Sequence, residues 1–269
     1  MSRALDRLLW PSLWAATLLF VGWGLVPRAP LFNTVLSPPR LVALASMVKL
    51  ALLVLGAACS WQSRRHLDAD NPVRPAWTWL AAGLSANVLG QAMLARYQLV
   101  GQESPFPSVG DVFYLLAYPL IGAALVQFVR AYHEAGYPMG SPGERARLLA
   151  VTAIVCASLS FVVLRPVVLS DLPPFQKALT AAYPLLDMAL LVPLALLLRT
   201  TWHFRGGSVG TAWMAVLTGI VFMCAGDVLF AYFTALGRTG LDPFVHGAYI
   251  MAYGLIAAGV RKHLALVAG

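Results

Sequence analysis

Eight long apolar stretches, separated by short polar or Pro- and Gly-rich connections, constrain this chain more than any other feature. A helix needs about 20 apolar residues to cross the hydrocarbon core of a bilayer, because each residue adds only about 1.5 Å. The stretches cover residues 8–27, 41–60, 76–97, 109–130, 147–168, 177–198, 209–236 and 243–261. This pattern predicts an all-α membrane protein with eight transmembrane helices, forming one transmembrane domain over residues 1–269.

Composition favours the same fold class. Charged residues make up 11% of the chain, whereas an ordinary soluble domain carries about 25%. No basic stripe with interleaved aromatic residues occurs, so we expect the lipid bilayer as a partner and no nucleic acid. The three cysteines lie inside apolar stretches without C-x-x-C spacing, which predicts buried side chains rather than disulfides or metal ligands. No motif identifies a cofactor.

Lysine and arginine residues are unevenly divided between the two ends of the predicted helices. Twelve lie at the chain termini or in the connections on that side, and six lie on the opposite side. Because cytoplasmic connections are enriched in these residues, both termini are predicted to be cytoplasmic. No A-x-A cleavage site follows the first stretch, so we expect it to be kept as a helix rather than removed as a signal peptide.

The two halves of the chain, about residues 1–136 and 137–269, resemble each other. The third stretch, WTWLAAGLSANVLGQAMLARY, aligns without gaps with the seventh, WMAVLTGIVFMCAGDVLFAYF. YLLAYPLIGAAL in the fourth matches YIMAYGLIAAGV in the eighth, and KLALLVLGAA in the second matches DMALLVPLAL in the sixth. The alignment pairs Trp77 with Trp213, Gly83 with Gly219, Gly90 with Gly226, Gln91 with Asp227, Tyr114 with Tyr249, Tyr118 with Tyr253 and Lys49 with Asp187. Three matches in order predict a parallel four-plus-four repeat.

Lys49 is the only charged residue in the apolar run ASMVKLALLVLGAA. A lone charge near the bilayer centre costs roughly 2.5–3.5 kcal/mol on insertion scales. Because Asp187 is its equivalent in the other half, we hypothesise an ion pair between Lys49 and Asp187 near the pseudo-symmetry axis. The alignment indicates equivalence of the two positions and leaves open whether they touch.

Several further polar groups are predicted to lie in or near the outer half of the membrane. Together they form a candidate ligand-binding cavity open toward the outside, lined by Lys49, Asn87, Gln91, Asp111, Asp187, Asp227 and His246. Each also has a structural interpretation. Asp111 follows Ser108 by three residues, which is typical of a helix capping box. Asn87 and Gln91 suit hydrogen bonds between helices, and so does Asp227. The tyrosines near helix starts suit interfacial anchors.

The stretches PFPSVGDVFYLLAYPLIGAAL, AAYPLLDMALL and CAGDVLFAYF resemble the multi-helix membrane input module at the N-terminus of many bacterial signalling proteins. Those proteins carry a GGDEF diguanylate cyclase domain, often with an EAL domain, or a histidine kinase after the last helix. The resemblance covers about residues 75–262 and implies signal reception in the bacterial inner membrane. No output domain follows Lys262. We therefore expect either the sensory part of a longer protein or a relative that acts through a partner.

A fainter resemblance is to the lysoplasmalogenase family of eight-helix membrane proteins. Its members place a lysine in helix 2 and Gly-Asp or Ser-Asp pairs in helices 3 and 7. Lys49 and the pair Gly226-Asp227 fit this pattern, but the position in helix 3 is Gly90-Gln91. Loss of that second carboxylate argues against hydrolysis, because the general base and the general acid need separate groups.

Several functions remain open on the sequence. The favoured one is a non-catalytic sensory module that binds an unknown small or lipidic ligand and signals to a cytoplasmic output, a protein partner or a homodimer. The alternatives are an accessory subunit of a larger membrane complex that binds lipid or pigment, an intramembrane lipid hydrolase using Asp227 and Lys49, and a carrier. No G-x-S-x-G, H-E-x-x-H or P-loop motif occurs, which favours a role without catalysis.

Overall fold

A computed structural model describes residues 3–32, 36–102 and 105–268, and these residues form helices and connections without a strand. The helices are α1 (Arg3–Leu25), α2 (Pro38–Arg65), α3 (Arg74–Leu99), α4 (Val109–Glu134), α5 (Pro142–Leu159), α6 (Arg165–Leu169), α7 (Pro174–Thr201), α8 (Ser208–Ala235) and α9 (Asp242–Val267). A π-helical turn at Ser160–Leu164 joins α5 to α6 in one continuous rod. The all-α prediction is confirmed.

Local sequence signals set several helix starts. Proline occupies the first turn of α2, α3, α5, α7 and α9, where its missing N–H has no intrahelical partner to lose. Ser108 and Asp111 form the predicted capping box at the start of α4, and Ser141 and Glu144 form another at α5. The start of α4 matters for function, because it places Asp111 at the candidate site.

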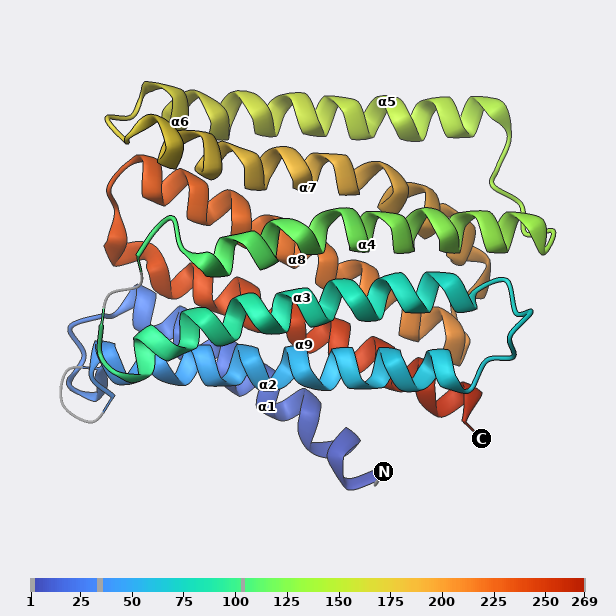
Figure 1. The fold of residues 1–269 in the computed structure, drawn as a ribbon, viewed down its shortest axis with the longest axis horizontal. Helices are drawn as coiled ribbons and strands as arrows, with labels where there is room; N and C mark the ends of the chain where they lie inside the picture. Colours follow the sequence, from blue (N-terminus) through green and yellow to red (C-terminus); the bar gives the residue numbers. More distant parts are fainter. Residues whose placement is uncertain (1–2, 33–35, 103–104, 269) are drawn as a thin grey trace.

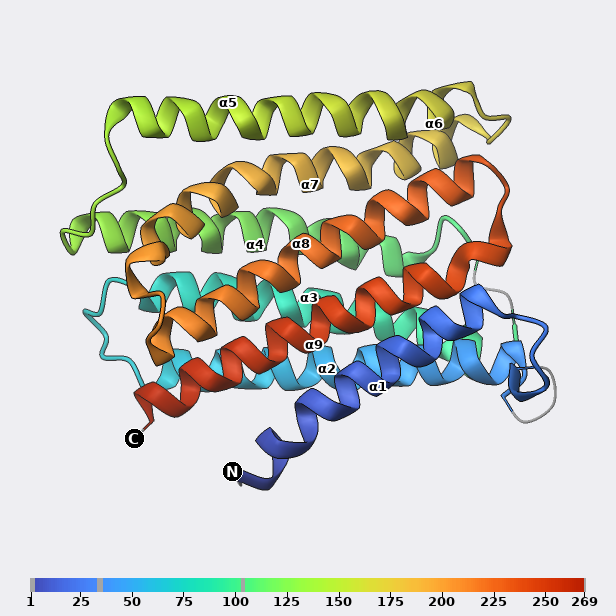
Figure 2. The same cartoon turned by 180° about the vertical axis from the view of Figure 1, so that it is seen from behind.

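The helices form a two-layered bundle (Figure 1). The layer of α2, α3 and α4 faces the viewer in Figure 1, and α1, α9 and α8 lie behind it, as the reverse view in Figure 2 shows. Helix α7 closes one edge by packing against both α4 and α8, and α5 lies outside α7. Helices α3 and α8 therefore occupy central positions, and α9 packs against α1, α2 and α8.

Among the described residues, six helical rods are long and apolar enough to cross a membrane: α2, α4, the α5–α6 rod, α7 together with the short turn after it, α8 and α9. A seventh apolar segment, Leu9–Leu25 in α1, is shorter. The structure thus has the character of a multi-pass membrane protein. Each of the eight predicted stretches falls on a helix. Helix α3 is the one that belongs neither to the six long apolar rods nor to the shorter apolar segment.

Small residues let the central helices approach closely. A Cβ atom at Gly219 of α8 would lie 2.8 Å from the carbonyl oxygen of Ala252 and 2.9 Å from the amide nitrogen of Ile256, both on α9. A Cβ atom at Gly83 of α3 would lie 2.7 Å from Cγ1 of Ile121 on α4. Membrane helices associate through such small-residue contacts because lipid offers no hydrophobic driving force.

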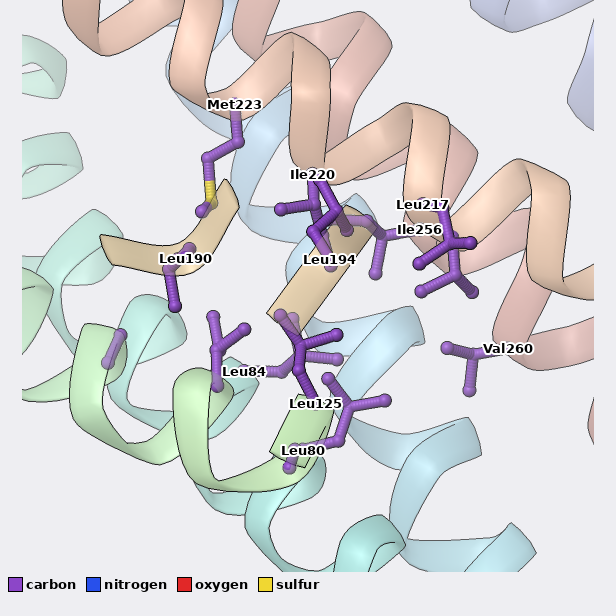
Figure 3. Packing of buried hydrophobic residues seen from close by; sticks show 14 of the residues in the cluster. Leu80, Leu84, Leu125, Leu190, Leu194, Leu217, Ile220, Met223, Ile256 and Val260 are labelled. Atoms are coloured by element: carbon purple, nitrogen blue, oxygen red, sulfur yellow. The ribbon is translucent and has the colours of Figure 1, made fainter. Parts of the chain in front are cut away.

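The apolar core fills the space between the two layers (Figure 3). Leu84 of α3, Leu125 of α4 and Leu190 of α7 lie close together in this view, facing Ile220 and Met223 of α8. Toward the end of the bundle where α3 starts and α9 finishes, the core continues with aromatic rings. Trp77, Phe128, Trp213 and His263 are in ring contact there, so this end of the bundle is closely packed.

Candidate functional site

The candidate site is a cavity of about 360 Å³, within the usual size range of small-molecule sites. Its lining comes from the C-terminal halves of α3 and α8, from the N-terminal halves of α2, α4, α7 and α9, and from the connection before α4. All these segments lie in the same half of the bundle, on the left in Figure 1. Ile121 and Tyr253 lie at the deep end of the cavity, whereas Pro105 and Asp242 lie near the helix ends.

Asp227 on α8 is the central acid of the cavity and is only 6% exposed. Its Oδ1 accepts a hydrogen bond from the Tyr249 hydroxyl at 2.5 Å, and its Oδ2 accepts one from the Tyr118 hydroxyl at 2.8 Å. The two tyrosines come from α9, which packs directly against α8, and from α4 in the opposite layer. Hydrogen bonds to a charged acceptor are stronger than neutral ones, so these two bonds tie three helices together.

Gly226 leaves space for the ring of Tyr249 against α8. A Cβ atom at Gly226 would lie 2.9 Å from Cε1 of Tyr249, so a larger residue would push the ring away from Asp227. The corresponding arrangement on the other side uses Gly90. A Cβ atom there would lie 3.0 Å from Cδ1 of Tyr114, whose hydroxyl donates to Oε1 of Gln91 at 3.0 Å.

Asp111 combines capping with a second contact. Its Oδ2 accepts hydrogen bonds from the backbone N–H and the hydroxyl of Ser108 at 2.6 and 2.9 Å. Its Oδ1 accepts a hydrogen bond from the Tyr183 hydroxyl at 2.5 Å. The carboxylate is therefore stabilised by the start of α4 and by α7, and it also lines the cavity.

Lys49 is the cation of the cavity. Its side chain is 3% exposed, its Nζ lies 3.4 Å from Nδ1 of His246, and its Nζ stands 5.6 Å from the ring centroid of Tyr249. No carboxylate of the described side chains lies within ion-pair distance of it. Among the described residues, the ammonium is thus held by the Nδ1 atom of His246 and the aromatic face of Tyr249, without a counter-ion.

The hypothesis of a Lys49–Asp187 ion pair is wrong. Asp187 is 2% exposed and faces Tyr118, Cys224 and Asp227 instead. Helix α2 packs against α3 and α9, whereas α7 packs against α4 and α8, so the central helices separate the two residues. The two positions that the sequence alignment pairs lie on opposite sides of the bundle, so the alignment did not predict a contact.

Six of the seven predicted site residues line the cavity: Lys49, Asn87, Gln91, Asp111, Asp227 and His246. Asp187 is the exception and lies outside the lining, with no hydrogen bond of normal geometry to either carboxylate oxygen among the described residues. Gln91 donates to the carbonyl oxygen of Ser46 at 3.4 Å, which joins α3 to α2. The amide nitrogen of Asn87 is buried and has no hydrogen-bond partner in the described part of the chain.

The tyrosines were not predicted as site residues. Instead of anchoring the helices at the interface, Tyr114, Tyr118, Tyr183, Tyr249 and Tyr253 all line the cavity. Their hydroxyls orient Gln91, Asp111 and Asp227. The signal that could have identified them is in the sequence alignment of the two halves, since a glycine followed by an acid or amide is followed by a tyrosine 23 residues after Gln91 and 22 residues after Asp227.

Replacing Lys49 by methionine should raise the free energy of unfolding by about 1–3 kcal/mol. Methionine fills a similar volume and removes a buried charge that has no counter-ion, a change that is often neutral or stabilising. The measurement is a sodium dodecyl sulfate titration of the micellar protein, with Lys177→Met at the start of α7 as the control. A loss of more than about 1 kcal/mol would mean that the Lys49 charge is compensated in the folded protein.

The site combines carboxylates that already accept hydrogen bonds from the protein with a cation that has no counter-ion among the described residues. Comparisons of the chain with protein-family models, with curated proteins and with solved structures find no match. The functional proposal therefore rests on the geometry of this cavity.

Proposed function

We propose that the chain is a non-catalytic sensory module of a bacterial inner membrane, which binds a small molecule in the cavity and signals toward the cytoplasm. The observation that carries this proposal is a cavity lined by a buried ammonium that has no counter-ion in the part of the chain that the structure describes. A buried ionisable group in a membrane segment is expensive and is a functional candidate by default. A ligand that completes the site would explain its retention.

The proposal includes eight membrane spans with both termini in the cytoplasm. Helix α3 has 26 residues and packs along α2 and α4, which have 28 and 26 residues. A helix of that length measures roughly 39 Å, more than the hydrocarbon core of a bilayer requires. The polar residues Asn87 and Gln91 lower the mean hydropathy of α3. Both line the cavity rather than facing lipid, so they do not prevent α3 from crossing the membrane. In this orientation the cavity lies in the outer half of the membrane.

An internal four-plus-four repeat is part of the same proposal. Helix α2 packs against α3 of its own half and α9 of the other, and α7 packs against α8 of its own half and α4 of the other. Gly83 meets Ile121 as Gly219 meets Ile256, and Tyr114 bonds Gln91 as Tyr249 bonds Asp227. These contacts exchange under a two-fold axis along the bundle.

The two halves carry different polar groups at the cavity. The aligned pairs are Lys49 with Asp187, Asn87 with Met223, Gln91 with Asp227 and Asp111 with His246, of which Asp187 alone lies outside the lining. The packing glycines and tyrosines are kept, whereas the polar groups are exchanged. Such divergence would turn a symmetric scaffold into a one-sided binding site.

Helix α9 offers a path for the signal. It contributes His246, Tyr249 and Tyr253 to the cavity, and His263 lies near its opposite end, roughly 25 Å away. The His263 ring lies 4.3 Å from the Trp77 ring and 6.4 Å from the Trp213 ring, between centroids. A ligand that prefers one packing of α9 over another would shift the position of its C-terminal end.

The test combines native mass spectrometry with a distance measurement. Protein released gently from its own membrane should be a monomer or dimer carrying at most one small molecule. Adding that molecule back should shift the distance between spin labels at Gln62→Cys and Leu266→Cys by about 1–2 Å, the size of typical helix shifts. Both positions are exposed, near the C-terminal ends of α2 and α9.

Other outcomes would identify the alternatives. Stoichiometric partner subunits or bound pigment would favour an accessory subunit, a role that also suits the lipid-exposed rod of α5, of which only 6% is buried. Release of a fatty acid or aldehyde from a phospholipid analogue, abolished by Asp227→Asn, would favour a hydrolase. Either result would contradict the sensory proposal.

Cysteine labelling should report the proposed orientation. In a cysteine-free background, Gln102→Cys and Gly240→Cys should react with a membrane-impermeant maleimide added to intact cells. Glu134→Cys and Arg205→Cys should react only after the cells are opened. All four positions are exposed in connections or at helix ends. Labelling of all four from one side would contradict the spans between them.

A further inference from the structure

We propose that the cavity binds an amphipathic anion, with its carboxylate or phosphate group at Lys49 and its apolar body along the rest of the cavity. This inference rests on the proposed ligand-binding function and names the class of ligand. It follows from a comparison of which polar groups of the cavity are already satisfied and which are not.

Three acceptor groups of the cavity, the carboxylates of Asp111 and Asp227 and the amide oxygen of Gln91, already accept hydrogen bonds from donors of the protein. Each oxygen of Asp227 already accepts a tyrosine hydroxyl, and Asp111 accepts bonds from Ser108 and Tyr183. The Oε1 atom of Gln91 accepts from Tyr114. Asp242 lies at the exposed mouth, where water can solvate it. A cationic ligand would therefore compete with bonds that the protein makes within itself.

The donors, in contrast, are unfulfilled. Lys49 has three N–H groups, and a neutral histidine nitrogen at 3.4 Å is its one hydrogen-bond partner among the described residues. The buried amide nitrogen of Asn87 also lacks an acceptor there. Asn87 lies at about the depth of Lys49, because α2 and α3 are antiparallel and the contact between Gln91 and Ser46 puts the two residues four and three positions further inward. Two donors at this depth without an acceptor among the described residues favour a ligand that supplies acceptors.

Charge decides which acceptor suits Lys49. Burying an ammonium without a counter-ion is costly, and an anion that enters the cavity would remove that cost. A charge-assisted hydrogen bond to a carboxylate or phosphate is about twice as strong as a neutral one. The protein supplies no such anion within ion-pair distance in the part of the chain that the structure describes.

The remaining lining is apolar. It includes the side chains of Val42, Leu94, Phe106, Ile121, Met223 and Phe230. A purely polar anion such as inorganic phosphate would leave this surface in contact with water, so an apolar body attached to the anionic group fits better. The space of about 360 Å³ suits a small amphiphile rather than a whole two-chain lipid.

Four probes with the same alkyl chain test the inference: octanoate, octyl phosphate, octanol and octylammonium. Their dissociation constants are measured by titration calorimetry on the full chain in phosphatidylcholine nanodiscs, with the heat of empty nanodiscs subtracted. We expect one saturable site at which octanoate or octyl phosphate binds at least about tenfold tighter than octanol, the size of a charge-assisted bond. The better of the two anions tells whether a carboxylate or a phosphate is the natural head group.

Variants at Lys49 make the result specific. In Lys49→Met the ratio between anion and alcohol should fall to within about twofold, whereas Lys49→Arg and the control Lys177→Met should keep it. Since Lys49→Met is expected to be at least as stable as the native chain, a change in binding will not reflect unfolding.

The contrary outcomes are distinct. Tightest saturable binding of octanol or octylammonium would overturn the anion and leave the ligand-binding function intact. If Lys49→Met still bound the anion more tightly than octanol by the same ratio, the proposal that the anionic group lies at Lys49 would be overturned. Absence of saturable binding for all four probes in the native chain would overturn the inference and the proposed function together.

Discussion

Replacing Asp227 by alanine should lower the free energy of unfolding by about 2–4 kcal/mol. The substitution leaves the hydroxyls of Tyr118 and Tyr249 without their acceptor inside the bundle, and bonds to a charged group contribute about 1.5–3 kcal/mol each. Water that enters the cavity recovers part of this loss. Asp227→Asn keeps one carbonyl acceptor and should cost about half as much.

A double-mutant cycle with Tyr249→Phe separates this effect from general disruption. We expect a coupling energy of about 1.5–3 kcal/mol between Asp227→Ala and Tyr249→Phe, because either change alone removes the same bond. Tyr232→Phe serves as the matched control. Tyr232 lies on α8, the helix of Asp227, but its hydroxyl donates to no carboxylate in the described structure. Coupling below about 0.5 kcal/mol for Tyr249 would contradict the role assigned to Asp227 as the link between helices.

The second large effect concerns the contact between α8 and α9. Gly219→Val should cost about 3 kcal/mol or more, because the new side chain meets the backbone of Ala252 and Ile256 within 3 Å. Backbone atoms cannot rotate away, so the helices must separate. The same free-energy measurement in dodecyl sulfate applies.

The order of three glycine variants sharpens this prediction. Gly83→Val should cost about 1–3 kcal/mol, since its closest contact is the movable side chain of Ile121 and the nearest backbone atom lies 3.2 Å away. Gly143→Val in α5 is the control and should change stability by less than about 0.5 kcal/mol, because a Cβ atom there meets nothing within 4 Å. Equal costs at Gly219 and Gly143 would mean that α8 and α9 are not closely packed.

Much of the candidate site could be predicted from the sequence, because the depth of a residue in the bundle depends only on its position along its own helix. The position of Lys49, Gln91 or Asp227 along its apolar stretch sets how far the residue lies from the helix end. Residues at similar depth were therefore grouped together, and six of the seven line one cavity. The capping role of Asp111 is equally local, because Ser108 is three residues away.

Contacts between helices were not accessible in the same way. Which residue meets which depends on the rotation of each helix and on its neighbours, and both are decided by packing between segments far apart in the chain. For this reason Lys49 faces His246 on α9 rather than Asp187 on α7. The tyrosines point inward for the same reason, since Gly90 and Gly226 let their rings lie flat against α3 and α8.

The sequence by itself determined the all-helical class, the apolar stretches, the helix starts and the depth of each polar group, because hydropathy and capping act within a few residues. The tertiary structure alone decided that Asp227 is held by two tyrosines while Lys49 is left without a carboxylate. Satisfaction of a buried polar group depends on the atoms that surround it, and those atoms come from three or four different helices.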